Sequence, residues 1–492
     1  MGRWTVGAGD ARDQAASSSA SLTPSGAPEG VRAAPGSFRD PQGQVFESGS
    51  RIFRALNAPL APFPHTWSPE GPLAELVSAG KLWPAKPLTP DEVPPDVRAA
   101  APAAVGFLEH PRIATITFPY EWPFEMLKRA ALLHLELHRE LLKRDLTLSD
   151  GFAYNVQFVG TRPVFIDALA IEPYVEGRPW AGYSQFCESF LNPLLLASRG
   201  CDTWQDNYRG RVRGIPTSEV ARQLGFWGAW RAGALIHVFL NSKVESRGGG
   251  PAAANTPKVS RAGLDLMLAS LERCIRKLSL PAAKSANWGS YEGDNSYSAE
   301  QRAKKHEIVR EFIARTGPGL VLDLGCNAGE YAEVALAAGA QSVIGLERDA
   351  QAVNLAVRRA DGLTRPFLPL QGDIQNASPA LGWDLAERRA LRERLQPDAV
   401  LCLALIHHLV IGEGVPLEKV VRTLVSLAPT GLIELVPRED PMSRRIAGPP
   451  DRLTHRYDLP ALLSILSQTA VVTNQIFLSE SGRVLIEFRR EP

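Results

Sequence analysis

Val321-Leu322-Asp323-Leu324-Gly325-Cys326-Asn327-Ala328-Gly329 is the stretch that decides the fold of this chain. An apolar run ends in an acidic residue, and two glycines follow it four residues apart. The Ala-rich residues 330–340 then predict a helix. A buried strand, a tight turn and a helix N-terminus in this order bring backbone N–H groups up to a ligand. The stretch therefore predicts an α/β domain with a ligand site at the turn.

The spacing of the glycines argues against a dinucleotide site. A dinucleotide fingerprint requires G-x-G-x-x-G, which a pyrophosphate can approach closely. Asn327 stands where the middle glycine would be, and no third glycine follows in phase. The turn therefore lacks a cradle for a diphosphate. An acid just before G-x-x-x-G instead resembles motif I of the class I S-adenosylmethionine (SAM) methyltransferases, whose ligand has no phosphate.

Further strand signals follow in the order that such a fold requires. Residues 341–347 predict a strand that ends in Glu347, 18 residues after Gly329, where a carboxylate can accept two hydrogen bonds from a ribose diol. Residues 368–373 predict a third strand ending in Asp373, the acid that similar enzymes use to hold the adenine amino group. The remaining predicted strands are residues 398–406, 431–436, 471–478 and 484–488, the last two as an antiparallel hairpin.

The fold class that follows is α/β: a C-terminal Rossmann-like methyltransferase with a seven-stranded mixed sheet, preceded by an α+β N-terminal domain. Taken singly, these acids also fit strand-end caps or solvated carboxylates, and the glycines fit ordinary turns. Their order and spacing over five strands favour the methyltransferase interpretation. We expect the cofactor S-adenosyl-L-methionine to contact Asp323, Gly325, Asn327, Gly329, Glu347, Asp373, Ile374 and Leu403.

The end of the predicted fourth strand carries the candidate catalytic residues. Amino-directed enzymes of this class often have Asn/Asp-Pro-Pro-aromatic there, and this chain has Leu403-Ala404-Leu405-Ile406-His407-His408. Transfer to an oxygen or a carbon is therefore favoured over transfer to an exocyclic amine. A neutral imidazole suits a general base, so we predict that His407 or His408 removes a proton from the acceptor. The alternative is that one histidine faces the core and the other caps a loop.

The resemblance to a SAM-dependent methyltransferase family that includes a host-specificity nodulation protein covers most of the folded chain. It rests on SYSAEQRAKKHEIV, VLDLGCNAGEYA, LALIHHL and IELVPRED, and upstream on PYEWPFEMLKRAALLHLELHRELL, SDGFAYNVQF, RPVFID and QFCESFLNPLLL. It implies methylation of a small-molecule, glycan or lipid-linked acceptor.

Glu434, at the end of the predicted fifth strand, and Glu439-Asp440 beyond it could contact substrate or a divalent ion, but a place at the surface is favoured for them.

Composition limits the classes of protein to which this chain can belong. The 492 residues are enough for two or three domains, and 54 Lys+Arg against 53 Asp+Glu give no general affinity for nucleic acid. Five scattered cysteines without C-x-x-C spacing fit a reducing compartment and argue against a zinc site. No apolar window approaches a membrane span, and no signal peptide is visible. A cytoplasmic protein is expected.

Composition also divides the chain. Residues 1–36 are rich in Ala, Ser, Gly and Pro and predict a disordered tail. Residues 37–245 form the predicted N-terminal domain, with a hairpin at 45–54, a strand at 113–118, an amphipathic helix at 124–142, and strands at 155–158 and 163–166. A Gly/Pro linker (246–260), a helical connector (261–295) and the methyltransferase domain (296–492) follow.

The N-terminal domain has a second motif. Asp150 and Asn155 stand five residues apart after the long helix, and a strand ends at Asp167 twelve residues later. This resembles the catalytic loop and metal-binding acid of kinase-like phosphotransferases, in which Asn and the second Asp hold magnesium. However, H-R-D, the Phe-Gly after Asp167, a Gly-rich loop and a clear strand lysine are all missing. A degenerate nucleotide-binding lobe is therefore favoured over an active phosphotransferase, and turn and strand-end acids are the simpler alternative.

One further alternative concerns the chain as a whole. It could be a binding module whose SAM site is vestigial. The complete set of Asp323, Gly325, Gly329, Glu347 and Asp373 argues against that.

Overall fold

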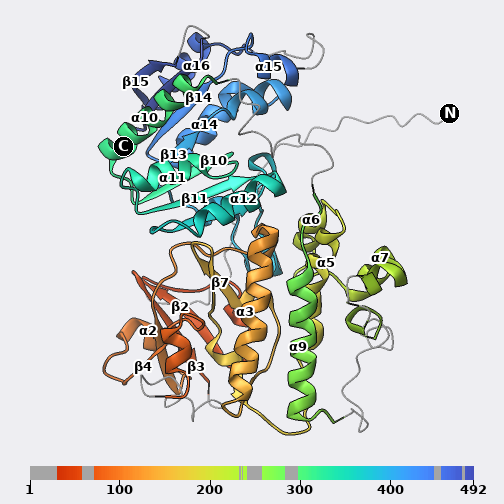
Figure 1. Ribbon diagram of the computed structural model, residues 1–492. Helices are drawn as coiled ribbons and strands as arrows, with labels where there is room; N and C mark the ends of the chain where they lie inside the picture. Colours follow the sequence, from red (N-terminus) through yellow and green to blue (C-terminus); the bar gives the residue numbers. More distant parts are fainter. Residues whose placement is uncertain are drawn as a thin grey trace, which may run out of the picture.

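The computed structural model describes residues 30–57, 71–231, 234, 236–240, 258–282, 297–447, 456–478 and 482–491. These residues form an N-terminal domain with a small antiparallel sheet and a C-terminal domain built on a seven-stranded sheet (Figure 1). Most of the predicted linker (246–257) and the end of the predicted connector (283–295) lie outside the described residues.

The N-terminal sheet has the strand order β1-β2-β3-β5-β4. The predicted hairpin is confirmed, because β2 and β3 pair with Ser48 opposite Arg51. The tail was predicted too long, since residues 31–33 form β1 on β2 and Val31 is buried in the small core beside Phe46 and Phe53. The strand bounds are β1 (Val31–Ala33), β2 (Gly43–Ser48), β3 (Arg51–Leu56), β4 (Lys86–Leu88) and β5 (Gly106–His110).

The strand predicted at residues 113–118 is wrong. This segment has no partner strand within the described chain. Instead, the side-chain amide of Gln157 bonds both backbone groups of Thr117, accepting from its N–H at 2.9 Å and donating to its C=O at 2.9 Å. A buried side chain thus satisfies the backbone where a neighbouring strand would otherwise do so.

The long predicted helix is confirmed as α3 (Phe124–Leu142), and its apolar stripe is buried. Helix α9 (Arg261–Lys277) packs alongside it, joined by an ion pair from Arg139 Nε to Asp265 Oδ1 at 2.8 Å. The predicted strand pair is confirmed as β7 (Val156–Val159) with β8 (Arg162–Phe165), and β6 (Leu146–Leu148) pairs with β9 (Ile171–Pro173). Further helices are α1 (Ala74–Ser78), α2 (Pro95–Ala100), α4 (Tyr183–Phe186), α5 (Asn192–Ser198), α6 (Trp204–Arg209) and α7 (Thr217–Arg231).

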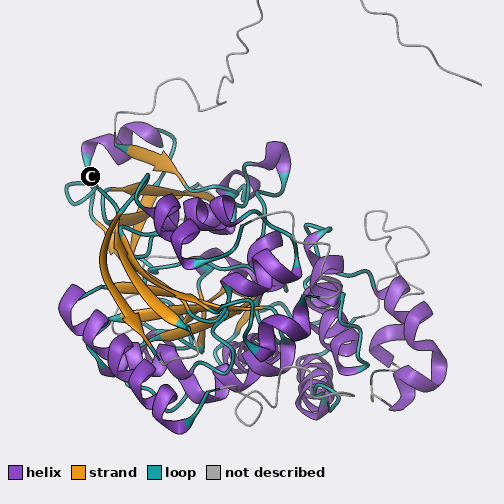
Figure 2. Cartoon of the chain, turned by 90° about the horizontal axis from the view of Figure 1, so that it is seen from above, coloured by secondary structure: helices purple, strands orange, loops and turns teal. Residues whose placement is uncertain are grey.

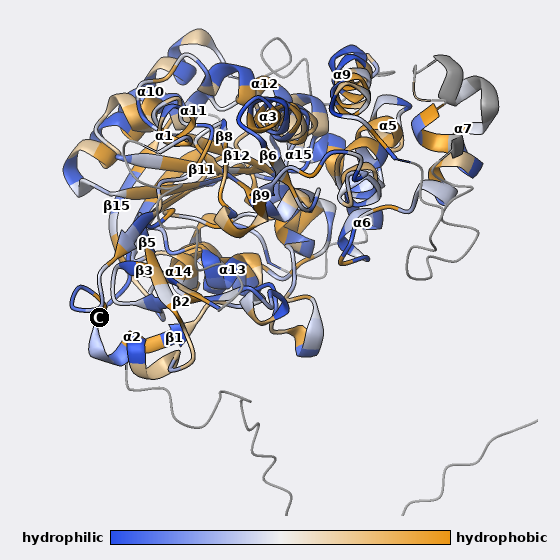
Figure 3. Cartoon of the chain, turned by 90° about the horizontal axis from the view of Figure 1, so that it is seen from below, coloured by the Kyte–Doolittle hydropathy of each residue, from blue (hydrophilic) through white to orange (hydrophobic). Residues whose placement is uncertain are grey.

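The C-terminal sheet confirms the predicted seven-stranded mixed sheet. Its order is β12-β11-β10-β13-β14-β16-β15, parallel from β12 to β14 and antiparallel at β16 and β15. Figure 2 shows these strands as one twisted layer between helices, and Figure 3 shows them mainly in hydrophobic colours. The strand bounds are β10 (Leu320–Leu324), β11 (Ser342–Glu347), β12 (Phe367–Gln371), β13 (Ala399–Cys402), β14 (Thr430–Leu435), β15 (Val471–Phe477) and β16 (Val484–Arg489).

The connections of this sheet place a crevice beside β10. The chain runs outward from β10 to β11 and β12, then returns to β13 on the other side. Such a reversal separates the loops that follow the strands, so ligands bind there at the carboxyl ends. The helices of this domain are α10 (Ala299–Thr316), α11 (Glu330–Ala337), α12 (Ala350–Ala360), α13 (Leu391–Arg394), α14 (Leu417–Leu427), α15 (Pro441–Ile446) and α16 (Leu459–Leu466).

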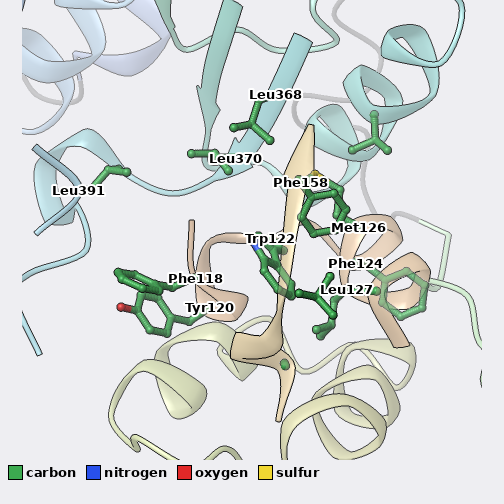
Figure 4. Close-up of a cluster of buried hydrophobic side chains, with 14 of the residues drawn as sticks. Phe118, Tyr120, Trp122, Phe124, Met126, Leu127, Phe158, Leu368, Leu370 and Leu391 are labelled. Atoms are coloured by element: carbon green, nitrogen blue, oxygen red, sulfur yellow. The ribbon is translucent and has the colours of Figure 1, made fainter. Parts of the chain in front are cut away.

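The two domains share one hydrophobic core. Leu368 and Leu370 of edge strand β12 lie in the same buried cluster as Trp122 and Phe158 of the N-terminal domain (Figure 4). The N-terminal domain therefore covers an edge of the C-terminal sheet that would otherwise be open. Within the described residues, no helix combines the length and the apolar character that crossing a membrane requires.

Candidate functional site

A cavity of about 1050 Å³ opens at the carboxyl ends of the parallel strands, at the point where the strand order reverses. Seven of the eight residues predicted to bind the cofactor line it; Gly329 does not. The seven are Asp323, Gly325, Asn327, Glu347, Asp373, Ile374 and Leu403. Residues from four different strand ends thus converge on one space.

The glycine turn is tied to the neighbouring strand. Gly325 N–H and Cys326 N–H both donate to Leu346 C=O, at 2.8 and 3.3 Å. Gly325, Asn327 and Gly329 all have positive φ, at 70°, 49° and 81°. Asn tolerates this conformation better than most residues, which explains how it can replace a glycine here. Gly329 acts through packing, because a Cβ there would lie 2.5 Å from the Phe367 ring.

Asp323 points into the cavity from the end of β10. It is almost fully buried, and its Oδ2 has no hydrogen-bond partner among the described residues. Burial raises the pKa of this carboxyl to about 7, while the positive charge of Lys305 acts in the opposite direction. An unsatisfied buried carboxyl is costly, so Asp323 favours a ligand that brings a cation or a donor to Oδ2.

Glu347 and Asp373 each hold their own loop in place. Glu347 accepts from the backbone N–H of Asn327 at 3.0 Å and of Asp349 at 2.7 Å. Burial nevertheless raises the pKa of its carboxyl. Asp373 accepts from Gln375 N–H at 2.9 Å and lies 3.4 Å from Arg348. Both carboxylates are therefore held in place in the lining of the cavity.

The end of β13 is strained next to the cavity. Strand β13 stops at Cys402, earlier than predicted, and the chain turns through Ala404, a non-glycine residue with φ of 49°. Leu403, Ala404 and Leu405 all line the cavity. A left-handed alanine costs on the order of 1–2 kcal/mol, and such strain is concentrated at functional sites.

The two candidate bases have different environments. His408 lines the cavity, whereas His407 is buried away from it and neither ring nitrogen has a partner among the described residues. Burial lowers the pKa of His408 to about 4 and that of His407 to about 2. Of the two predicted candidates for the base, His408 is therefore the one that lines the cavity. His407 faces the core, because the chain enters a helical turn at this point.

A buried ionic network lies beneath one end of the cavity. Lys305 Nζ pairs with Glu434 Oε2 at 2.7 Å, and both side chains are almost completely buried. Tyr297 Oη donates to Glu434 at 2.5 Å, and Arg483 Nε pairs with Asp440 at 2.8 Å. The expectation of a surface position is wrong for Glu434 and Asp440, which are both buried, whereas Glu439 is exposed. The ion pairs with Lys305 and Arg483 replace the solvation that the two buried carboxylates lose.

Lys305 and Tyr297 also line the cavity, although neither was predicted as a site residue. The sequence around Lys305 does contain an indication that this side chain is buried. Lys305 is in helical phase with Ile308, Val309 and Phe312, which form the buried stripe of α10. A charged residue on an apolar stripe is unusual and indicates a buried partner.

The N-terminal domain assembles a second polar cluster. Asn155 Nδ2 donates to Asp150 Oδ1 at 2.7 Å, and Arg54 of β3 pairs with Asp167 Oδ1 at 2.8 Å. Burial raises the pKa of Asp150 to about 7, and the charges of Asp167 and Asp40 raise it further. The predicted trio is thus brought together, with Arg54 as an unexpected strand cation. Among the described residues, no three His, Cys, Asp or Glu side chains are grouped to hold a metal ion.

Comparison with known proteins identifies a curated relative. Nodulation protein NoeA of Rhizobium meliloti (strain 1021) is 39% identical over 464 residues, which cover 92% of this chain and 95% of that protein. No protein-family model matches the chain.

Solved structures match a smaller part of this chain than the relative does. The N-methyltransferase NodS from Bradyrhizobium japonicum WM9 is 13% identical and covers 40% of this chain and 99% of its own, with a TM-score of 0.30. Magnesium protoporphyrin IX methyltransferase (ChlM) from Synechocystis PCC 6803 with bound SAM is 20% identical and covers 42% and 89%, with a TM-score of 0.29.

Proposed function

This chain belongs to the family of nodulation protein NoeA, and from that premise we propose that it is a SAM-dependent methyltransferase acting on an oxygen or carbon of a small-molecule, glycan or lipid-linked acceptor. One observation carries the proposal. Asp323 and Glu347, at the ends of β10 and β11, and Asp373, just after β12, line a single cavity at the point where the strand order reverses.

The lining residues suit the parts of this cofactor. The unsatisfied Oδ2 of Asp323 can receive the ammonium group of its methionine half. Glu347 at the end of β11 suits the ribose diol, and Asp373 with Ile374 suits the adenine. When bound, the cofactor supplies an electrophilic methyl group. The protein orients the acceptor and, at His408, takes up the proton that the acceptor loses.

His408 is neutral at pH 7, because burial lowers its pKa to about 4. The same shift makes it a weaker base than an ordinary histidine, so it takes up the proton as the methyl group is transferred and not before. The cavity lining just before His408 in sequence consists of Leu403, Ala404 and Leu405. Their side chains are apolar, which limits the access of water to the reacting atoms.

Binding and transfer are tested separately. Calorimetry should show binding of SAM or S-adenosylhomocysteine (SAH) to the full chain near micromolar affinity, about 8 kcal/mol. Gly325→Arg and Glu347→Ala should each abolish it, and normal binding by both variants would refute the assignment. A screen of acceptors with methyl-labelled SAM then identifies the acceptor. SAM binding without transfer to any acceptor would instead support a vestigial site.

A second candidate function is nucleotide binding by the N-terminal domain. The bonds Asn155–Asp150 and Arg54–Asp167 support a kinase-like lobe, because Arg54 comes from the five-stranded antiparallel sheet and the other three residues from the region after α3. A carboxyl with a pKa near 7, as at Asp150, is poised for proton transfer. Mg-ATP should raise the thermal midpoint of the wild type but not of Asp167→Ala. Equal midpoints with and without Mg-ATP in the wild type would exclude this function.

A further inference from the structure

The C-terminal domain does not enclose the cavity alone. Arg199, Cys201, Asp202 and Trp204 of the N-terminal domain line it, at the end of α5 and the start of α6. Residues 280–282, which follow α9, also line it. Residues 199–204 and 280–282, which are far apart in sequence, therefore form one wall of the cavity. Most of the remaining lining comes from the C-terminal domain.

Two hydrogen bonds locate this wall at the ends of β11 and β12. Gln351 Nε2, in the first turn of α12 after β11, donates to Pro281 C=O at 3.1 Å. Arg209 Nη1 of α6 donates to Asn376 C=O, just after β12, at 3.1 Å. Glu347 and Asp373 stand at these same strand ends. The wall therefore faces the part of the cavity that suits a nucleoside.

The position of the wall is fixed by strong contacts between the domains. Arg129 makes two hydrogen bonds of 2.6 Å to the carboxylate of Asp361, which follows α12. Asn354 of α12 accepts from the backbone N–H of Glu125 at 2.9 Å, at the first turn of α3. Together with the shared core at Leu368 and Leu370, these contacts hold α12 and β12 against the N-terminal domain.

The opposite part of the cavity has different surroundings. Tyr297, Lys305, Tyr331 and Ile446 line it, with the Lys305 ammonium over both tyrosine rings, and all of them belong to the C-terminal domain. His408 lies between the two parts, because it follows β13 and its imidazole is within the influence of Arg348, after β11, and of Glu413. The part lined by Tyr297 and Ile446 therefore suits the acceptor. The volume of about 1050 Å³ is at the upper end for a single-ligand pocket, which leaves space for an acceptor.

From these contacts we propose that the N-terminal domain is part of the cofactor site. Residues 199–204 and 280–282 close over the nucleoside half of the cofactor, and the acceptor approaches from the side of Tyr297 and Ile446. The inference rests on the proposed function and adds a role for the N-terminal domain within it: holding the cofactor. Cofactor binding then depends on the contact between the two domains.

Cys201 allows a direct test in the full-length wild type. It is partly accessible, while the other four cysteines are buried. Alkylation with N-ethylmaleimide is followed by mass spectrometry of the Cys201 peptide, with and without saturating SAH. SAH should slow the modification by about tenfold or more, an occupancy effect of about 1.4 kcal/mol. Bound SAH, measured by calorimetry, together with an unchanged Cys201 rate would overturn the proposal.

A matched pair of variants tests the connector. Ala282 is exposed and lines the cavity, whereas Ser279 is exposed and does not. Ala282→Trp should weaken SAH binding about tenfold, while Ser279→Trp should leave it unchanged, with equal thermal midpoints for both. Equal SAH affinity in the two variants would contradict the proposal. Failure of the wild type to bind SAH would instead refute the methyltransferase assignment, so the two failures are distinguishable.

Discussion

Arg394 of the C-terminal domain forms a buried ion pair with Glu121 of the N-terminal domain. Its guanidinium also donates to Ile116 C=O at 2.6 Å and lies 4.4 Å from the centre of the Phe118 ring. Both charged side chains are more than nine-tenths buried. The pair therefore joins the domains where water cannot replace either partner.

Arg394→Met should destabilise the protein by about 3–5 kcal/mol, because it leaves the Glu121 carboxylate buried without its cation. Arg392→Met is the matched control: Arg392 is exposed and bonds only to Ser426 among the described residues. Urea unfolding followed by tryptophan fluorescence measures both. Similar midpoints for the two variants would contradict a structural role for the Arg394 pair.

Asp323→Asn should change how stability depends on pH. Burial raises the folded-state pKa of Asp323 to about 7, above an unfolded value of about 3.9. Such a group stabilises the fold below the unfolded pKa, and this contribution is lost as the pH rises through about 7. The stability of the wild type relative to Asp323→Asn should therefore fall by roughly 3 kcal/mol between pH 5 and pH 8. Urea unfolding at both pH values measures it, and parallel curves for the two proteins would disprove the shifted pKa.

Gly329→Ala should cost more stability than Gly317→Ala. Both glycines have positive φ, so each substitution carries a backbone cost of about 1–2 kcal/mol. At Gly317 no atom lies within 4 Å of the added Cβ, whereas at Gly329 the Phe367 ring lies at 2.5 Å. Overpacking should add about 1–3 kcal/mol at Gly329 and displace the glycine turn, weakening SAH binding. Thermal unfolding and calorimetry check this; equal losses in both variants would show that the ring moves aside freely.

His408→Asn should lower the rate of methyl transfer about 10²–10⁴-fold and leave SAH affinity unchanged. His407→Leu should retain most of the activity, because His407 does not line the cavity. Since burial lowers the pKa of His408 to about 4, the wild-type rate should be insensitive to this histidine between pH 6 and pH 8. Transfer from labelled SAM gives the rates. Loss of activity in His407→Leu alone would reverse the assignment.

Much of the C-terminal fold could be predicted because its signals are local. The bounds of β11, β14, β15 and β16 were predicted to within one residue at every end. Buried parallel strands are continuous apolar runs, and turns require glycine, so neither needs knowledge of distant contacts. β13 was predicted too long because the apolar run continues through the strained turn at Ala404.

The failures arose where a distant side chain changed the local outcome. The apolar residues 113–118 have strand character, but Gln157 satisfies the backbone at Thr117. Glu434 resembles a solvated acid in sequence, but Lys305 and Arg483 pair with it in the interior. In both cases the deciding partner is far away in the chain, and no local pattern encodes it.

By itself, the sequence determined the strand–turn–helix around Gly325, the acids at the ends of β10 and β11 and after β12, and the exclusion of a diphosphate cradle. Only the tertiary structure decided that His408 rather than His407 lines the cavity. It alone also brought residues 199–204 and 280–282 to the same cavity and placed Arg54 beside Asp167. The physical reason is that periodicity and turn chemistry act between near neighbours in sequence. Burial, ion pairing and the shape of a cavity depend instead on segments that meet only when the whole chain has packed.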